Sequence, residues 1–480
     1  MLKNKYALKF AYTAMIRYKL VVSLLFAITV VLFACKMLIN DYHQEAAFKS
    51  FKNEAKSALF EKYRAQLNKA MENISVDFST IDCDALFSKN VYKTSRNIAK
   101  KYSYRFNKED LILKSPMKDR CSLIKQIFGF NETPLSKEEE EFPLAYAALV
   151  YKWTDEVFYM FSALYHPQNV YCIAIDRKSD PSFMSSVLLL GKCFPNIQIM
   201  TVDKVDYCGF SVIHAVVQCL HALTYSNRPW RYFQYLSNFD LPLKTNREMV
   251  RIFKRLNGSF NTEILEYPSD RLMGKKVETI PHGIKLYKSS LSATFSRESA
   301  EFIVNNEKAR SILWFLKGTY CPDESLWTTI AGNPTLRMPN GFDASRWLRA
   351  INHNKASISA TSFPYYISRF QVWANSKYRH MCKGKFVHAS CVYGVDDLHI
   401  LDERPELIAH KFYLDYQPAA FFCLYRRVRE RAIGDIENFN DAVYGAIPGP
   451  RVLRGICFSR SEVVLVVYFT NAHIQSLSPL

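Results

Sequence analysis

The chain has 480 residues, of which 49% are hydrophobic and 14% aromatic, and its formal net charge is +18. This length and composition suit one large folded domain with accessory segments, and they exclude disordered and fibrous proteins. A basic chain can bind nucleic acid, an anionic membrane or an anionic substrate. Because the Lys and Arg residues are dispersed and no recognised DNA- or RNA-binding motif occurs, we do not expect nucleic acid as a partner.

The N-terminus predicts a membrane anchor. An apolar run extends from Leu20 to Ile39, interrupted only by Lys36, and about 20 such residues are needed to cross a bilayer. The segment before it is basic and lacks acidic residues, so the positive-inside rule places the N-terminus in the cytosol. We therefore expect a cytoplasmic tail over residues 1–19, a transmembrane signal-anchor over 20–39 and a lumenal remainder. A cleaved signal peptide is the alternative, although its apolar core usually has about 7–15 residues.

Glycosylation tripeptides and cysteines agree with a lumenal domain. The acceptor asparagines of the three tripeptides are Asn73, Asn131 and Asn257. Cys35 lies in the expected anchor, which leaves eleven of the twelve cysteines beyond it, and most of these should pair in an oxidising compartment. They lack the spacing of a metal site, so we expect no bound metal.

The following segment changes from a charged stem to alternating strands and helices. Residues 40–80 are expected to form the stem, because their first part is charged and helix-favouring. Beyond residue 140, short apolar runs bounded by turn residues predict strands, and the stretches between them predict helices. The strands are expected at 142–151, 170–176 and 197–202, and the helices at 154–165 and 181–192. This alternation predicts a parallel sheet.

Asp176 ends the second of these strands. Ligands of such sheets bind at the carboxyl ends of the strands, so Asp176 is well placed to contact a nucleotide. Its alternative role is to cap the helix that follows at Pro181.

A series of motifs in order along the chain resembles the core 2/I-branching β1,6-N-acetylglucosaminyltransferase family. The resemblance covers about residues 80–430 and is carried by the segments ETPLSKEEEEFPLAYAALVY, YHPQNVYCIAIDRKS, KCFPN, YFQYLSNFDLPLKTNREMVRIFK, SRESAEFIVNNEKAR, TYCPDESLWTTI, SRFQVW, SCVYGVDDL and AHKFYLD. It implies a GT-A-like nucleotide-sugar fold, UDP-N-acetylglucosamine as donor, inversion at the anomeric carbon and no metal requirement. The one Asp-x-Asp motif, Asp82-Cys83-Asp84, lies outside the nucleotide-binding region, in agreement with metal-free catalysis.

The resemblance also implies four disulfides, Cys83–Cys423, Cys121–Cys193, Cys172–Cys219 and Cys382–Cys391. Cys208, Cys321 and Cys457 lie outside this framework.

The resemblance places the catalytic base in the motif Cys321-Pro-Asp-Glu. We assign Glu324 as the general base that takes the proton of the acceptor hydroxyl, and we expect Asp323 either to orient it or to cap the following helix. Without the resemblance, Asp-Glu after a proline indicates an ordinary helix start.

Without a metal, cationic side chains must neutralise the diphosphate of the donor. The resemblance assigns one of these cations to Lys411. The other is an arginine in the family and is His388 here, a residue that is only partly charged near neutral pH. Lys383 or Lys385 is a candidate to compensate.

The acceptor positions depart further from the family. Trp373 matches a residue that stacks on the acceptor sugar, but the expected tyrosine two residues later is Asn375. Asn261 replaces an acidic residue, for which Glu263 is a possible substitute. A basic pair expected nearby is not evident around residues 270–273.

The sequence thus predicts a single-pass type II membrane protein of the Golgi, with a catalytic domain over residues 81–430 and an unassigned extension over 431–480. The expected reaction is β1,6 transfer of N-acetylglucosamine to a glycoprotein glycan, either an O-glycan or a poly-N-acetyllactosamine chain. One alternative is a xylosyltransferase-like enzyme that uses UDP-xylose. The other is a non-catalytic relative that binds glycans or partner enzymes.

Overall fold

A computed structural model describes residues 12, 15, 18, 19, 22, 23, 54–75, 77–89, 93–353, 364–434 and 438–453. The chain divides into two units, Met1–Lys62 and Tyr63–Leu480. In the first unit, residues 54–62 are helical. The predicted anchor over 20–39 lies almost entirely outside the described residues, and among those that are described no helix is both long and apolar enough to cross a bilayer.

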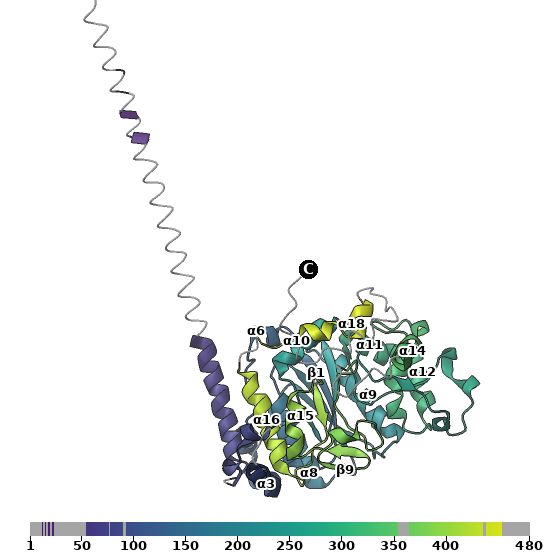
Figure 1. The fold of residues 1–480 in the computed structure, drawn as a ribbon, viewed down its shortest axis with the longest axis horizontal. Helices are drawn as coiled ribbons and strands as arrows, with labels where there is room; N and C mark the ends of the chain where they lie inside the picture. Colours follow the sequence, from purple (N-terminus) through teal and green to yellow (C-terminus); the bar gives the residue numbers. More distant parts are fainter. Residues whose placement is uncertain are drawn as a thin grey trace, which may run out of the picture. The chain divides into compact units, whose positions relative to one another are not determined.

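A five-stranded sheet forms the centre of the second unit, with strand order β3-β2-β1-β4-β8 (Figure 1). Its strands are β1 (Leu144–Val150), β2 (Val170–Asp176), β3 (Ile197–Val202), β4 (Tyr232–Ser237) and β8 (Thr294–Ser296). The pairs β1–β2, β2–β3 and β1–β4 are parallel, and only β8 runs antiparallel to its neighbour β4. The predicted α/β architecture with a mainly parallel sheet is therefore confirmed.

Helices cover both faces of this sheet, which explains why β1 and β2 are continuous apolar runs. Successive side chains of a strand point to opposite faces, so Tyr146 and Ala148 join one core and Ala145 and Ala147 the other. The first core includes residues of α7 (Thr154–Leu164), α8 (Pro181–Cys193), α10 (Asn246–Leu256) and α16 (Pro418–Ala432). The second includes residues of α9 (Phe210–Thr224), α11 (Arg297–Asn305), α12 (Glu307–Leu316) and α13 (Leu326–Ala331).

Shorter elements surround the sheet. The helices are α2 (Cys83–Leu86), α3 (Lys93–Lys101), α4 (Lys108–Lys114), α5 (Arg120–Phe128), α6 (Lys137–Glu140), α14 (Ala344–His353), α15 (Leu398–Asp402), α17 (Ala442–Gly445) and α18 (Pro448–Leu453). The strands are β5 (Asp240–Pro242), β6 (Leu265–Glu266), β7 (Tyr287–Lys288), β9 (Lys385–Val387), β10 (Ser390–Val392) and β11 (Ile408–His410), and they form the antiparallel pairs β5–β11, β6–β7 and β9–β10.

Local sequence signals explain where several helices begin. Asp180 caps α8 by accepting from Ser182 N, and Pro181 occupies the first helical position. Thr245 and Glu248 form a capping box at the start of α10. The acidic run after Ser136 forms the short helix α6, with Ser136 as its cap.

The structure contains the four disulfides that the family resemblance implies and a fifth, Cys208–Cys321. Cys83–Cys423 joins α2 to α16 across a sequence separation of 340 residues. The fifth disulfide departs from the expected framework, in which both of its cysteines were left without a partner.

The folded domain extends beyond both predicted boundaries. Within the segment expected to be a stem, Tyr63 and Leu67 are buried, and Phe78 packs edge-to-face on Phe422 of α16. The phenol of Tyr63 accepts a hydrogen bond from the buried Arg429, at 3.0 Å. Beyond residue 430, Tyr444 of α17 is buried and donates to Pro405 O, and α17 packs on α10. The strand-like run at 462–469 lies outside the described residues.

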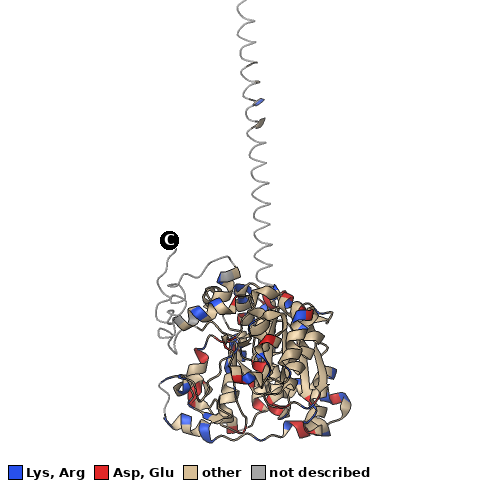
Figure 2. Cartoon of the chain, turned by 90° about the vertical axis from the view of Figure 1, so that its right-hand side faces the viewer, with Lys and Arg blue, Asp and Glu red and all other residues tan. Residues whose placement is uncertain are grey.

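Charged residues are spread over the domain. In the view of Figure 2, Lys and Arg and Asp and Glu occur in many parts of the domain, although α6 is mainly acidic and α10 and α16 are mainly basic.

The burial of residues 63–80 predicts that a chain beginning at residue 81 is unstable. Loss of this segment removes the buried side chains of Tyr63, Leu67, Ala70, Ile74 and Phe78. Leu67, Ile74 and Phe78 are each worth about 1.5–3 kcal/mol, in a domain whose stability is about 5–15 kcal/mol. A chain beginning at Glu54 serves as the control, because both retain the Cys83–Cys423 disulfide. Calorimetry should show cooperative unfolding only for the longer chain, and equal melting temperatures would contradict this account.

Candidate functional site

Asp176 lies at the carboxyl end of β2, in the position that the sequence predicted. Its carboxylate is 6% exposed and accepts from Lys178 N at 2.9 Å and from Val205 N at 3.3 Å. Because Asp180 caps α8, the alternative capping role of Asp176 is wrong. Asp176 instead ties the loop after β2 to the loop after β3, at the edge of the sheet where ligands of parallel sheets bind.

Lys411 and His388 come together through Val387. The amine of Lys411 donates to Val387 O at 3.2 Å, and His388 is the next residue, in the turn between β9 and β10. His388 is exposed and has a positive φ of 51°. Burial and, to a smaller extent, the positive charge of Lys152 lower the pKa of Lys411 to about 8. Both residues assigned to the diphosphate therefore lie in one place.

A buried ionic cluster fixes the backbone just before Lys411. Asp240 accepts from Arg369 at 2.9 Å and is 2.8 Å from His410 Nδ1. Burial alone would raise the pKa of Asp240, but the charge of Arg369 and the contact with His410 hold it below its ordinary value. Since His410 pairs with Asp240 across β11 and β5, this cluster sets the position of the residue that follows.

The acidic motif forms a second group, in the short 3-10 helix Pro322–Glu324. Glu324 Oε2 is 2.7 Å from Arg271 Nη2 and 3.4 Å from Lys288 Nζ. Burial and the neighbouring charge of Glu324 raise the pKa of Asp323 to about 7. Glu263 belongs to the same group, because its pKa is raised by burial while the charge of Lys288 opposes the rise. Arg271 and Lys288 therefore hold Glu324, and the charges of this group affect the pKa values of Asp323 and Glu263.

One loop connects this acidic group to Asp176. In the loop after β3, Val205 N donates to Asp176, and three residues later Cys208 forms the disulfide to Cys321, which directly precedes the acidic motif. Tyr207 lies in the same loop, and partial desolvation followed by the charge of Glu324 raises the pKa of its phenol. This loop therefore links the carboxyl edge of the sheet to the acidic motif.

The predicted acceptor residues are only partly assembled. Trp373 is half-buried and pairs through its backbone with Ser390 of β10, close to the turn that carries His388. Asn261 is buried, and its side-chain amide donates to Tyr365 O and accepts from Ile367 N. Both polar groups of Asn261 therefore hold the backbone, whereas Glu263 faces the acidic group.

Sequence reasoning missed both cations that hold Glu324. Arg271 lies within residues 270–273, where the basic pair was not recognised, and Lys288 lies in β7. Arg271 could have been found from the sequence, because it is an arginine at the place where the family has a basic pair. Lys288 gave no sequence signal, because its position depends on the pairing of β7 with β6.

The glycosylation and Asp-x-Asp positions differ in their settings. Asn257 is exposed, and Asn73 is half-buried with its amide donating to Lys69 O. Asn131 is 2% exposed and its amide donates to Thr133 O, so the prediction of a glycan there conflicts with its burial.

Asp82 caps α2, and Asp84 contacts Arg426 and Arg427, which gives the Asp-x-Asp motif a structural role.

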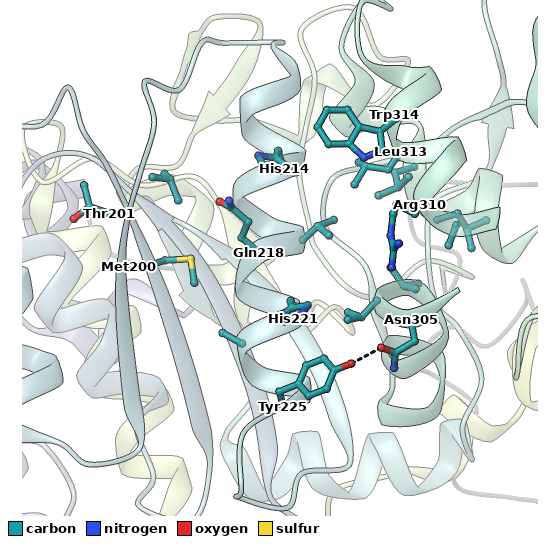
Figure 3. Close-up of a pocket in the computed structure, with 18 residues that line it drawn as sticks. Met200, Thr201, His214, Gln218, His221, Tyr225, Asn305, Arg310, Leu313 and Trp314 are labelled. Atoms are coloured by element: carbon teal, nitrogen blue, oxygen red, sulfur yellow. Dashed lines mark hydrogen bonds between the residues drawn. The ribbon is translucent and has the colours of Figure 1, made fainter. Parts of the chain in front are cut away.

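A cavity of about 660 Å³ lies outside this site, between β3, α9, α11 and α12 (Figure 3). Figure 3 shows His214, Gln218 and His221 on one side of it and Arg310 and Trp314 on the other. None of the predicted site residues lines it.

Comparisons with known proteins define the family. A family model described as Core-2/I-Branching enzyme matches residues 144–399. The N-acetyllactosaminide beta-1,6-N-acetylglucosaminyl-transferases of Homo sapiens and Mus musculus are 32% and 31% identical, over 63% of this chain and 76% and 77% of theirs. The Homo sapiens beta-1,3-galactosyl-O-glycosyl-glycoprotein beta-1,6-N-acetylglucosaminyltransferase 3 is 30% identical over 65% of this chain and 74% of its own.

The chain therefore belongs to the Core-2/I-Branching enzyme family and is a glycosyltransferase. Among solved structures, mouse xyloside xylosyltransferase 1 matches 42% of this chain and 83% of its own with a TM-score of 0.24 and 10% identity, which is too low to bear on the fold.

The raised pKa of Asp323 predicts a pH-dependent effect of Asp323→Asn on stability. Between the ordinary pKa of 3.8 and about 7, the folded state holds a proton that the unfolded state releases, so the parent loses stability as pH rises through this window. Each pKa unit corresponds to about 1.4 kcal/mol. Asp323→Asn should therefore gain melting temperature relative to the parent between pH 5 and pH 8. The same measurement on the exposed Asp110→Asn provides the control, and an Asp323→Asn difference that does not change with pH would refute the prediction.

Proposed function

We infer that this chain transfers N-acetylglucosamine from UDP-N-acetylglucosamine to a 6-hydroxyl of an O-glycan or related acceptor. The observation that carries this proposal is the placement of Glu324 between Arg271 and Lys288, joined by one loop to the sheet edge that holds Asp176. The names of the relatives, all β1,6-N-acetylglucosaminyltransferases, support the sugar and the linkage. A GT-A-like nucleotide-sugar fold is part of the proposal, supported by the mainly parallel sheet.

Glu324 is proposed to act as the general base. As the acceptor hydroxyl oxygen forms a bond to the anomeric carbon, Glu324 takes its proton, and the bond from that carbon to the UDP oxygen breaks. The attack occurs opposite to the leaving group, so the configuration inverts. The ion pairs with Arg271 and Lys288 fix the direction of the carboxylate, which favours a reactive alignment of base and hydroxyl. Asp323, with a pKa of about 7, can donate or accept a hydrogen bond beside it.

The departing UDP carries growing negative charge, which Lys411 is proposed to stabilise. Its amine is held at Val387 O beside the turn of His388, at the carboxyl edge of the sheet. Charge-assisted contacts of this kind stabilise a developing anion most strongly in a partly buried site. Asp176 is proposed to contact the nucleoside. Trp373 and Glu263 are proposed to contact the acceptor.

The Golgi lumen is the proposed location, with the chain anchored as a single-pass type II protein. The basic N-terminal flank and apolar run of the sequence support this topology. The five disulfides support an oxidising compartment.

Glu324→Gln should reduce transfer by about 10²–10⁴-fold while UDP binding changes little, because glutamine keeps the shape but does not accept the proton. Glu266→Gln is the matched control, since Glu266 is an exposed glutamate in β6 outside the acidic group. The assay is release of UDP and formation of glycan product with a panel of UDP-sugars and acceptors. Full activity of Glu324→Gln would exclude it as the base.

The same assay separates the alternative functions. A parent protein that binds glycans but transfers no sugar from any UDP donor would favour the non-catalytic relative. Transfer from UDP-xylose alone would favour the xylosyltransferase-like enzyme.

Transfer should persist in EDTA. The proposal assigns neutralisation of the diphosphate to side-chain cations, so removal of divalent ions should leave the initial rate within about twofold. A matched sample with added Mn²⁺ completes the test, and complete loss in EDTA that Mn²⁺ restores would refute metal-free catalysis.

A further inference from the structure

We propose that Lys152 is a diphosphate-binding residue, which together with Lys411 supplies the positive charge that His388 provides only in part. This inference rests on the proposed use of a UDP-sugar. It adds to the site a residue to which the sequence analysis gave no role.

Lys152 lies at the ligand-binding edge of the sheet and its backbone is fixed there. It follows the end of β1 at Val150 by two residues, beside the strand that ends at Asp176. Lys152 N donates to Asn238 Oδ1 at 3.2 Å, and Asn238 Nδ2 donates back to Lys152 O at 3.1 Å. Asn238 is 1% exposed and follows β4, so it joins the ends of two neighbouring strands. The base of the Lys152 side chain is therefore held by the central sheet.

The amine of Lys152 rests against aromatic rings. It lies 3.8 Å from the ring centre of Trp153, 5.5 Å from that of Phe239 and 5.7 Å from that of Tyr413. Among the described residues, no carboxylate lies within ion-pair distance of this amine or of the Lys411 amine. Aromatic faces stabilise a cation without neutralising it, so the positive charge remains available to an anion.

Lys411 shares this aromatic setting. Its amine lies 5.2 Å from the ring centre of Tyr413, the ring that Lys152 also approaches. The charge of Lys152 helps to lower the pKa of Lys411, as expected for neighbouring cations. The nearby Glu156 is buried and its pKa is raised well above its usual range, which favours its neutral form. Two like charges in a half-buried place are unfavourable until an anion joins them, and a diphosphate offers oxygens to both.

The two lysines named from the sequence as possible compensation are placed differently. The amine of Lys385 lies 4.3 Å from the ring centre of Tyr416, and the backbone N of Lys383 donates to Asp397. Among the described residues, neither lysine amine makes a cation–π contact with the ring of Tyr413. Lys152 is therefore the better supported partner of Lys411.

The test compares the affinity of UDP with that of uridine by titration calorimetry on the parent, Lys152→Met and Lys152→Arg. Loss of a charge-assisted contact should weaken UDP binding by about tenfold or more in Lys152→Met. Uridine, which lacks the diphosphate, should bind all three proteins within about twofold. Lys152→Arg, which retains the charge, should keep most of the affinity for UDP.

Lys317→Met is the matched control, because Lys317 also lies near an aromatic ring, at 5.3 Å from that of Trp314, but outside the proposed site. It should bind UDP as the parent does. If Lys152→Met does not fold, Lys152→Gln is measured in its place.

A parent that binds UDP while the Lys152 variant binds it equally well would overturn the role of Lys152 and leave the proposed function intact. Equal weakening for UDP and uridine would also overturn it, because the effect would then be structural. A parent that binds no UDP would overturn the proposed function and this inference together.

Discussion

The site depends on one buried carboxylate, that of Asp240. It is fully buried and is neutralised by Arg369 while contacting His410, so it connects the turn after β4 with strand β11. Removing one partner of such a buried charge pair typically costs about 3–5 kcal/mol. Arg369 also lies 5.4 Å from the ring centre of Tyr235 in β4, and the charge of Asp323 contributes to raising the pKa of that tyrosine after the effect of burial. The cluster therefore fixes the backbone just before Lys411, and through Arg369 it also packs against Tyr235 of the central sheet.

The sequence predicted the central sheet well because its signal is local. Strands β1 and β2 are buried on both faces, so each appears as an uninterrupted apolar run, and the turn and capping residues between them mark the helices. The boundaries of the domain were predicted less well. Residues 63–78 appear charged and stem-like, yet Tyr63 and Phe78 contact Arg429 and Phe422 of α16, a segment more than 330 residues away. Such a contact leaves no local pattern.

Site residues could be predicted from the sequence only where they belong to a family motif. Asp323, Glu324 and Lys411 were assigned through resemblance; in the structure Glu324 contacts Arg271 and Lys288, and Lys411 contacts Val387 O. The cations that hold Glu324 come from segments 53 and 36 residues earlier in the chain, and the positive charge beside Lys411 comes from a segment more than 250 residues earlier. Asn261 shows a departure from the family motif that the sequence alone did not explain. Its side-chain amide bonds to the backbone of residues 365 and 367, which gives the asparagine a structural role.

In the proposed site, the carboxyl edge of the sheet binds the nucleotide while the acidic motif faces the acceptor. A crystal structure of the protein with UDP bound tests this most directly. The account predicts the uridine beside Asp176 and the diphosphate within ion-pair distance of the Lys411 amine, with Glu324 left uncovered for the acceptor. UDP bound in the cavity between α9 and α12, or lying across Glu324 with its diphosphate away from Lys411, would contradict it.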